Sequence, residues 1–133
     1  MKKLGGFLQL VIIFLLIVGC GKSTMETMNE MKWTKITTED AKEIIDKEED
    51  IIILDVRSES EYKEGHITDS ILIPVDKLED KAENILKEKD QKVLIYCRSG
   101  NRSAKAADIL SKMGYTNVYD FGGINNWTYE VER

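Results

Sequence analysis

Residues 93–103 read Val-Leu-Ile-Tyr-Cys-Arg-Ser-Gly-Asn-Arg-Ser, and they combine an apolar run with a polar, glycine-containing loop. The four apolar residues that begin it are typical of a strand buried on both faces. The residues that follow, 104–113, repeat apolar side chains at helical spacing and end before Gly114. Cys97 therefore lies in a predicted turn that leads from a buried strand into a helix.

The rest of the chain from residue 33 onward alternates apolar runs with helical stripes. Such alternation predicts a small α/β domain with a mainly parallel central sheet flanked by helices on both faces. In sheets of this kind, sites form at the carboxyl ends of strands, where Cys97 stands. The expected elements are a helix begun by Thr37 or Thr38, a strand over 51–54, a helix over 60–64 ended by Gly65, a strand over 71–73 closed by Pro74, a helix over 76–86, strands over 93–96 and 117–119 on either side of the helix over 104–113, and a short helix around Trp127 after a turn at Gly122 and Gly123 near the cysteine loop.

The loop that contains Cys97 has the composition of a site for a reactive thiolate. A helix N-terminus leaves backbone N–H groups unpaired and carries positive partial charge, which stabilises an anion beside it. Gly100 lets the loop curl tightly, and Arg98 and Arg102 bring two permanent positive charges near the sulfur. A lone cysteine at a strand end is usually a small buried hydrophobe. A purely structural turn, however, does not need a glycine flanked by two arginines and two serines, so we predict that Cys97 is a nucleophile.

The N-terminus has the layout of an export signal. Lys2 and Lys3 precede an apolar run over 7–18, which is shorter than the about 20 residues that a membrane-spanning helix needs. The end of this run, Leu16 to Cys20, resembles the lipobox of bacterial lipoproteins, in which the cysteine receives a diacylglycerol thioether before cleavage. The alternative is an uncleaved anchor, which would leave the domain on the same side of the membrane.

The lipobox resemblance divides the chain into three parts. We expect a signal peptide over 1–19, a lipidated Cys20 with a flexible tether over 20–32, and one domain over 33–133. The tether is polar with scattered methionines and has no strong period. This organisation implies a protein that is lipid-anchored in the cell membrane, with its domain on the extracytoplasmic side.

Charge and cysteine content exclude several classes of function. The formal net charge is −5, and loss of Lys2 and Lys3 with the leader makes it more negative by two. An acidic surface argues against nucleic-acid binding. Two cysteines and one histidine cannot supply the four ligands of a zinc site, so we expect no metal. With Cys20 lipidated, Cys97 has no disulfide partner, and a thiol kept free outside the cytoplasm indicates a function.

Motifs along the domain resemble, in order, those of the single-domain rhodanese family. The resemblance implies that Cys97 attacks a sulfane-sulfur donor such as thiosulfate and becomes a persulfide. It then passes the outer sulfur to a thiophilic acceptor such as cyanide or a thiol, without a cofactor. The matching motifs are Leu54-Asp55-Val56-Arg57, Glu61-Tyr62, Gly65-His66-Ile67, Ile73-Pro74, residues 97–103, and Gly122-Gly123 before Trp127.

The same resemblance assigns roles to the residues around the nucleophile. Asp55 and Arg57 are expected to form a supporting ion pair, and the single histidine, His66, to stabilise a turn rather than act as a base. The departing sulfite is an anion that either loop arginine can stabilise. The residues expected to bind substrate are Arg98, Ser99, Gly100, Asn101, Arg102 and Ser103.

Two other functions stay open. Cysteine-dependent phosphatases and arsenate reductases also place a cysteine and an arginine around an oxyanion, but with five residues between them. Cys97 and Arg102 enclose four, which leaves little room for a tetrahedral phosphate. The other possibility is a module that carries sulfur or binds a partner protein without catalytic turnover. For a small tethered domain we expect a monomer.

Overall fold

The computed structural model describes residues 32–133. The predicted signal peptide, Cys20 and all of the predicted tether except Lys32 lie outside these residues. Among the helices of residues 32–133, none combines the length and the apolar character needed to cross a membrane.

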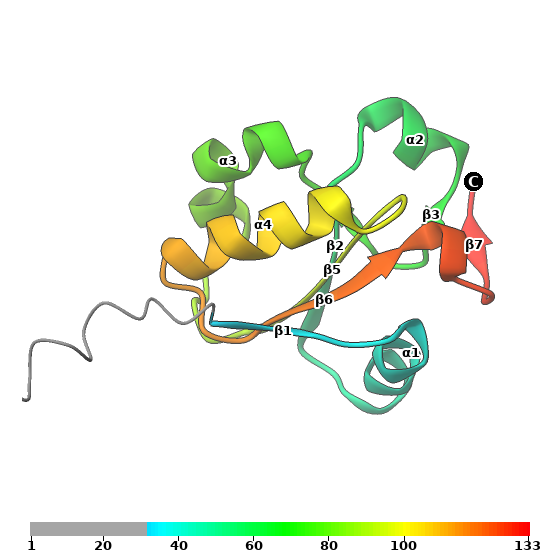
Figure 1. Ribbon diagram of the computed structural model, residues 1–133, viewed down its shortest axis with the longest axis horizontal. Coiled ribbons are helices and arrows are strands. Elements are labelled where there is room, and N and C mark those ends of the chain that lie inside the picture. Colours follow the sequence, from blue (N-terminus) through cyan, green and yellow to red (C-terminus); the bar gives the residue numbers. More distant parts are fainter. Residues whose placement is uncertain (1–31) are drawn as a thin grey trace, which may run out of the picture. The chain divides into compact units, whose positions relative to one another are not determined.

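A five-stranded parallel sheet forms the centre of the described part, which confirms the predicted fold class (Figure 1). The strand order is β1-β6-β5-β2-β4, so that β5, which ends at Cys97, occupies the middle of the sheet. All neighbouring strands run parallel. The strands are β1 (Trp33–Lys35), β2 (Ile51–Asp55), β4 (Ile71–Leu72), β5 (Lys92–Cys97) and β6 (Val118–Gly123).

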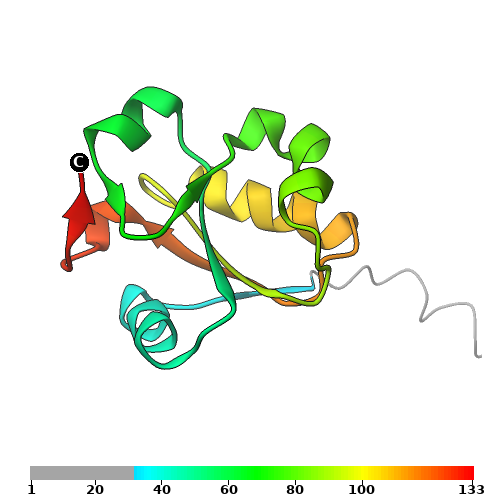
Figure 2. The same cartoon turned by 180° about the vertical axis from the view of Figure 1, so that it is seen from behind.

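Helices cover both faces of this sheet, as predicted (Figures 1 and 2). The helix α1 (Thr38–Lys47) lies against one face, whereas α3 (Leu78–Ile85) and α4 (Asn101–Lys112) lie against the other. The short α2 (Glu59–Glu64) lies beyond the carboxyl ends of the strands. Each of α1 and α2 begins with a capping box, from Thr37 and from Ser58, in which the side chain of the cap and that of the residue three positions later bond each other's backbone N–H.

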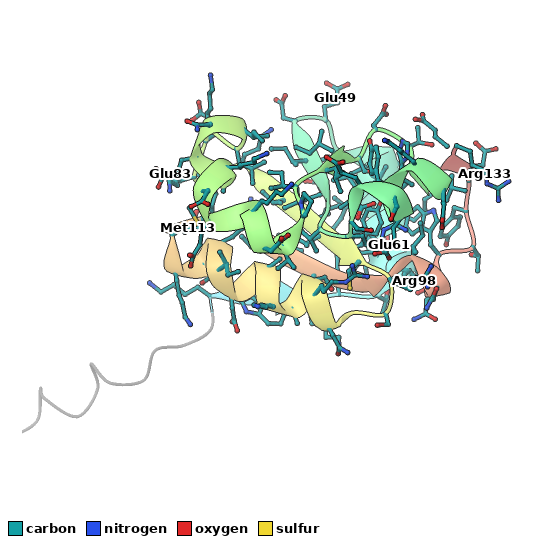
Figure 3. The ribbon with its side chains drawn as sticks, turned by 90° about the horizontal axis from the view of Figure 1, so that it is seen from above. Glu49, Glu61, Glu83, Arg98, Met113 and Arg133 are labelled. Atoms are coloured by element: carbon teal, nitrogen blue, oxygen red, sulfur yellow. The ribbon has the colours of Figure 1, made fainter. Side chains whose placement is uncertain are left out.

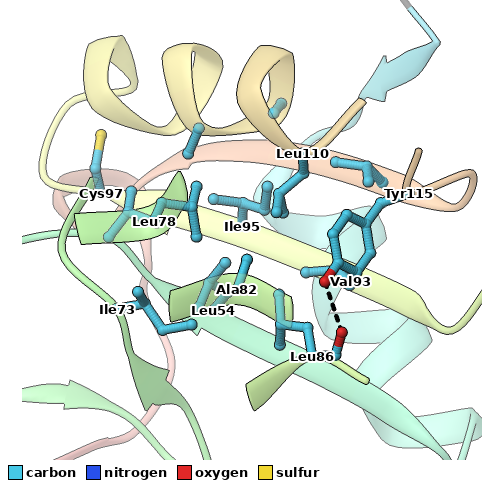
Figure 4. Close-up of a cluster of buried hydrophobic side chains, with 14 residues drawn as sticks. Leu54, Ile73, Leu78, Ala82, Leu86, Val93, Ile95, Cys97, Leu110 and Tyr115 are labelled. Atoms are coloured by element: carbon cyan, nitrogen blue, oxygen red, sulfur yellow. Dashed lines mark hydrogen bonds between the residues drawn. The ribbon is translucent and has the colours of Figure 1, made fainter. Parts of the chain in front are cut away.

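The strand β5 sends alternate side chains into two separate cores. Val93, Ile95 and Cys97 belong to the core beneath α3 and α4, while Leu94 and Tyr96 belong to the core beneath α1. Figure 4 shows the first core, with Cys97 at its edge and the hydroxyl of Tyr115 donating to the carbonyl of Leu86 at 2.6 Å. The face of the sheet on which Cys97 lies is therefore fixed by the packing of β5.

Several predicted boundaries differ from the structure. The helix α4 begins at Asn101 rather than at residue 104, because its first turn is polar and carries no apolar stripe. The predicted helix over 76–86 is a 3₁₀ turn, Val75–Lys77, followed by α3. Gly122 and Gly123 end β6 instead of forming a separate turn, and the helix after them, Ile124–Asn126, is a 3₁₀ turn that stops before Trp127.

Three short strands were not predicted. They are β1, at the edge of the main sheet, and the antiparallel pair of β3 (His66–Ile67) and β7 (Val131–Glu132). Each has two or three residues, too few for an alternating pattern to stand out in the sequence. The β3–β7 pair ties the end of the chain to the turn after α2.

Candidate functional site

Cys97 ends β5, and its side chain points into the loop that leads to α4. The Sγ atom accepts a hydrogen bond from the backbone N–H of Gly100 at 3.0 Å. The residue is only 1% exposed, so the protein shields most of the thiol from bulk water. A backbone N–H directed at a sulfur stabilises negative charge on it, as a nucleophilic thiolate or a persulfide requires.

The hydroxyl of Ser103 lies on the inner side of the same loop. Its Oγ is 3.5 Å from the Sγ of Cys97, 3.0 Å from the carbonyl oxygen of Gly100 and 3.3 Å from that of Gly122. Ser103 is fully buried; its Oγ accepts from the thiol of Cys97, and its single proton can be donated to one of the two carbonyls at a time. This hydroxyl therefore joins the sulfur, the loop and β6 in one hydrogen-bonded group.

The loop turns into α4 through Gly100, whose φ of 113° lies in the left-handed region that favours glycine. The first intrahelical bond runs from the N–H of Ala104 to the carbonyl of Gly100 at 3.2 Å. The N–H groups of Asn101, Arg102 and Ser103 precede this bond and have no acceptor within the helix. Together with the helix dipole they make this end of α4 attractive to an anion.

Gly123 lets the loop lie directly against the end of β6. A Cβ atom at this position would be 2.1 Å from the carbonyl oxygen of Arg98 and 2.8 Å from the Cα of Ser99, closer than any side chain can approach. The N–H of Asn125 donates to the same carbonyl of Arg98 at 3.2 Å. Gly122 and Gly123, which were expected near the loop, thus pack directly against its backbone.

The two loop arginines do not stand free beside the sulfur, because both meet Glu61 of α2. Arg102 donates from Nη1 and Nη2 to the two carboxylate oxygens at 2.8 and 3.0 Å, and the Nε of Arg98 is 3.5 Å from Oε2. Figure 3 labels Glu61 and Arg98. The hydrogen bond from Arg102 lowers the pKa of Glu61 to about 2. In turn, the pKa of Arg102 is raised, because this bond and the negative charge of Glu61 outweigh the effect of burial.

Sequence reasoning identified Glu61 only as part of a family motif and assigned it no role. The local signal it does carry is the spacing Ser58-x-x-Glu61, which is that of a capping box. That pattern explains why Glu61 lies in the first turn of α2, but it does not point to a partner 41 residues away.

Asp55 and Arg57 form a buried ion pair at the end of β2. Arg57 donates from Nε to Oδ1 of Asp55 at 3.0 Å and from Nη2 to Oδ2 at 2.7 Å. Nη2 also donates to the carbonyl of Gly65 at 2.7 Å, which ties β2 to the turn after α2. Burial acts to lower the pKa of Arg57, but the hydrogen bonds and charge of Asp55 outweigh it, so the pKa is raised.

His66 contacts α2 and β7. Its ring stacks on that of Tyr62 at a centroid distance of 3.7 Å, and its Nδ1 donates to the carbonyl of Tyr62 at 2.8 Å. The Nε2 is 3.3 Å from a carboxylate oxygen of Glu132. Both ring nitrogens thus have partners that hold the α2–β3 turn, and neither of these partners belongs to the Cys97 loop.

Ser99 and Asn101 are exposed at the tip of the loop. Among residues 32–133 their side chains have no hydrogen-bond partner, so they are available to a molecule that approaches the loop from solvent. Residues 32–133 contain no group of three or more histidine, cysteine, aspartate and glutamate side chains that could hold a metal ion.

Comparison with known proteins identifies the family to which this geometry belongs. A profile of the rhodanese-like domain matches residues 37–130. The thiosulfate sulfurtransferase GlpE of Coxiella burnetii is 36% identical over 98 residues, which cover 73% of this chain and 89% of the relative. YrkF of Bacillus subtilis, provisionally named a sulfur carrier protein, is 37% identical over 99 residues, 74% of this chain and about half, 52%, of the relative.

A solved structure supports the same family assignment as these two relatives. The crystal structure of a rhodanese-related protein from Thermoplasma volcanium has a TM-score of 0.65 and 36% identity, covering 74% of this chain and 97% of that one. A family profile, relatives and a solved structure all match the described domain, and the chain belongs to the family of rhodanese-like domains.

Proposed function

We propose that this domain is a sulfurtransferase that moves sulfane sulfur from a donor such as thiosulfate to cyanide or a thiol through a persulfide on Cys97. The observation that carries the proposal is the backbone N–H of Gly100 directed at the Cys97 Sγ from 3.0 Å, at the N-terminal end of α4. Relatives named as thiosulfate sulfurtransferases support the same chemistry.

In the first half of the reaction, the Cys97 thiolate attacks the outer sulfur of thiosulfate. A Cys97–sulfur bond forms, the S–S bond of the donor breaks, and sulfite leaves with the electron pair of that bond. In the second half, the acceptor attacks the outer sulfur of the persulfide, and the Cys97 thiolate is released unchanged. No proton has to move if the cysteine is already ionised, so a general base is not required.

The residues of the loop stabilise the charges that these steps carry. The N–H groups of Asn101 to Ser103, which have no acceptor within the helix, would bind the outer sulfur of the persulfide. Arg98 and Arg102 would bind the sulfonate oxygens of the donor and of the departing sulfite. Ser99 and Asn101 would contact the donor from the exposed tip of the loop.

We further propose that the mature protein is tethered to the cell membrane. The support for this part is the sequence: a leader over 1–19 with an apolar run is followed directly by Cys20 and then by a polar segment up to residue 32. A diacylglycerol group on Cys20 would hold the domain at the extracytoplasmic surface. If Cys20→Ala abolishes incorporation of radiolabelled lipid and releases the protein from membranes, the proposal stands; equal incorporation by both proteins contradicts it.

Steady-state turnover tests the catalytic proposal. The purified protein should convert thiosulfate and cyanide to thiocyanate and sulfite, and Cys97→Ser should lose this activity while keeping the fold. A wild type that accepts one sulfur atom but releases it to neither cyanide nor thiols is a carrier, the function that the name of YrkF favours. Hydrolysis of phosphate esters by the wild type would instead support the phosphatase alternative.

A further inference from the structure

Glu61 holds both arginines of the cysteine loop from a helix outside it. It accepts two hydrogen bonds from Arg102, at 2.8 and 3.0 Å, and lies 3.5 Å from the Nε of Arg98. Figure 3 shows Glu61 and Arg98 side by side where α2 approaches the loop. The two arginines and the one carboxylate together carry a formal charge of one rather than two.

This negative charge is fixed in place. The hydroxyl of Ser58 donates to Oε1 of Glu61 at 3.0 Å, and the capping box of α2 holds the side chain toward the loop. The side chain of Glu61 is 18% exposed. With its pKa lowered to about 2 by the bond from Arg102, the carboxylate stays ionised throughout the neutral range. An anionic donor that binds the loop arginines is therefore repelled by the negative charge of Glu61.

The electrostatic repulsion between the donor and the Glu61 carboxylate depends on the charge of the donor. Thiosulfate carries two negative charges, whereas an organic thiosulfonate carries one and offers the same kind of outer sulfur. Repulsion from one fixed negative charge grows in proportion to the charge of the ligand. Binding of a dianion is thus weakened more than binding of a monoanion.

Resting on the proposed function, we propose that Glu61 is a specificity-determining residue that acts through Arg98 and Arg102 and biases the site toward sulfane donors with a single negative charge. With a thiosulfonate, the Cys97 thiolate forms a bond to the outer sulfur, the donor S–S bond breaks, and a sulfinate leaves with the electron pair. The numbers of atoms and charges are the same on both sides, and no further reactant is needed.

The test compares two donors on one variant. Glu61→Gln removes the charge but keeps an amide oxygen that can serve the capping box, so α2 is retained. At low ionic strength, the ratio of kcat/KM for thiosulfate to kcat/KM for benzenethiosulfonate should rise about three- to tenfold in Glu61→Gln. Added salt should shrink this rise, because it screens the charge. Glu61→Asp, which keeps the charge, should retain the ratio of the wild type.

Glu64→Gln is the matched control. Glu64 is exposed on the same helix and, within the described residues, has no ion-pair partner. Its neutralisation changes the net charge equally and should leave the ratio unchanged. The proposal is overturned if Glu61→Gln leaves the ratio unchanged, or if Glu64→Gln raises it to the same extent.

A second measurement separates this proposal from the proposed function, because it needs no sulfur transfer. Anions that bind the loop should protect Cys97 from alkylation by iodoacetamide. In Glu61→Gln, protection by sulfate should strengthen at least about threefold more than protection by methanesulfonate. If neither donor transfers sulfur, the proposed function fails, and this arm alone decides the charge proposal. Equal strengthening for the two anions, or none, overturns it.

Discussion

Two arginine–carboxylate pairs of the domain, Arg57 with Asp55 and Arg102 with Glu61, are joined by paired hydrogen bonds but have different surroundings. Asp55 and Arg57 are 0% and 4% exposed. The other partner of Arg57, the carbonyl of Gly65, lies only eight residues further along the chain. Glu61 and Arg102 are 18% and 37% exposed and join two elements at the edge of the cysteine loop. The first pair is shielded from solvent, whereas solvent and ligands can reach the second pair.

This difference in burial separates stability from activity. Removing one partner of a buried pair leaves an uncompensated charge in a medium that solvates it poorly. Removing one partner of a half-exposed pair leaves a charge that water can solvate, so its effect is on the molecules that bind there. Substitutions in and around each pair test whether the buried pair mainly affects stability and the more exposed pair mainly affects activity.

The largest effect on stability is expected from Asp55→Ala. It leaves the Arg57 guanidinium buried without its carboxylate, and we expect a loss of about 3–5 kcal/mol in the free energy of unfolding. Chemical denaturation measures this loss. Glu43→Gln, which breaks an exposed pair with Lys47 on α1, is the control and should leave the denaturation midpoint unchanged. Equal midpoint shifts in the two variants would contradict the assignment of the buried pair as structural.

Gly123→Ala should impair activity more than stability. The new methyl group would overlap the carbonyl of Arg98, so the loop must move away from β6. A displacement of about 1 Å at the reacting atoms costs about 100-fold in rate, and we expect a fall of this order in kcat/KM. Gly114→Ala, at a glycine with no atom within 4 Å of the added Cβ, should not change kcat/KM of the folded protein. Unchanged activity in Gly123→Ala would show that close packing of the loop against Gly123 is not needed for catalysis.

Arg102→Ala should reduce kcat/KM for thiosulfate about 10- to 100-fold, because one charge-assisted contact is typically worth about 1.5–3 kcal/mol. Arg98→Ala should have a smaller effect, since its side chain is 58% exposed and its contact to Glu61 is longer. Arg102→Lys should recover only part of the loss, because a lysine cannot make the two parallel bonds. A larger loss in Arg98→Ala than in Arg102→Ala would make Arg98 the main donor-binding arginine and contradict this order.

The smallest effect is a dependence of stability on pH from Glu61. The pKa in the folded protein, about 2, lies below the ordinary value of 4.5, so the unfolded chain binds the proton more readily. The contribution of the pair, on the order of 1 kcal/mol, is therefore complete above about pH 4.5 and is lost as the pH falls toward 2. The difference in unfolding free energy between wild type and Glu61→Gln should shrink over this interval. A difference that stays constant would show that Glu61 stabilises through something other than its charge.

The parts of the site that were predictable from sequence are those with local signals. The apolar run before Cys97 and the helical stripe after it fix the strand-to-helix turn, and both belong to one continuous stretch of chain. The contact of Arg102 with Glu61 has no such signal, since it depends on where α2 lies relative to the loop. The need for glycine at Gly123 likewise arises from the approach of a carbonyl 25 residues earlier in the chain. Short strands such as β3 and β7 escape detection because two residues define no period.

The central claim is that Cys97 carries the transferred sulfur, and intact mass spectrometry of the purified protein tests it most directly. After reaction of the reduced protein with thiosulfate in the absence of an acceptor, the mass should increase by one sulfur atom, located by fragmentation on Cys97. Cyanide should then restore the original mass, and Cys97→Ser should show no increase. A wild type that gains no sulfur, or a Cys97→Ser protein that gains as much, would contradict the account.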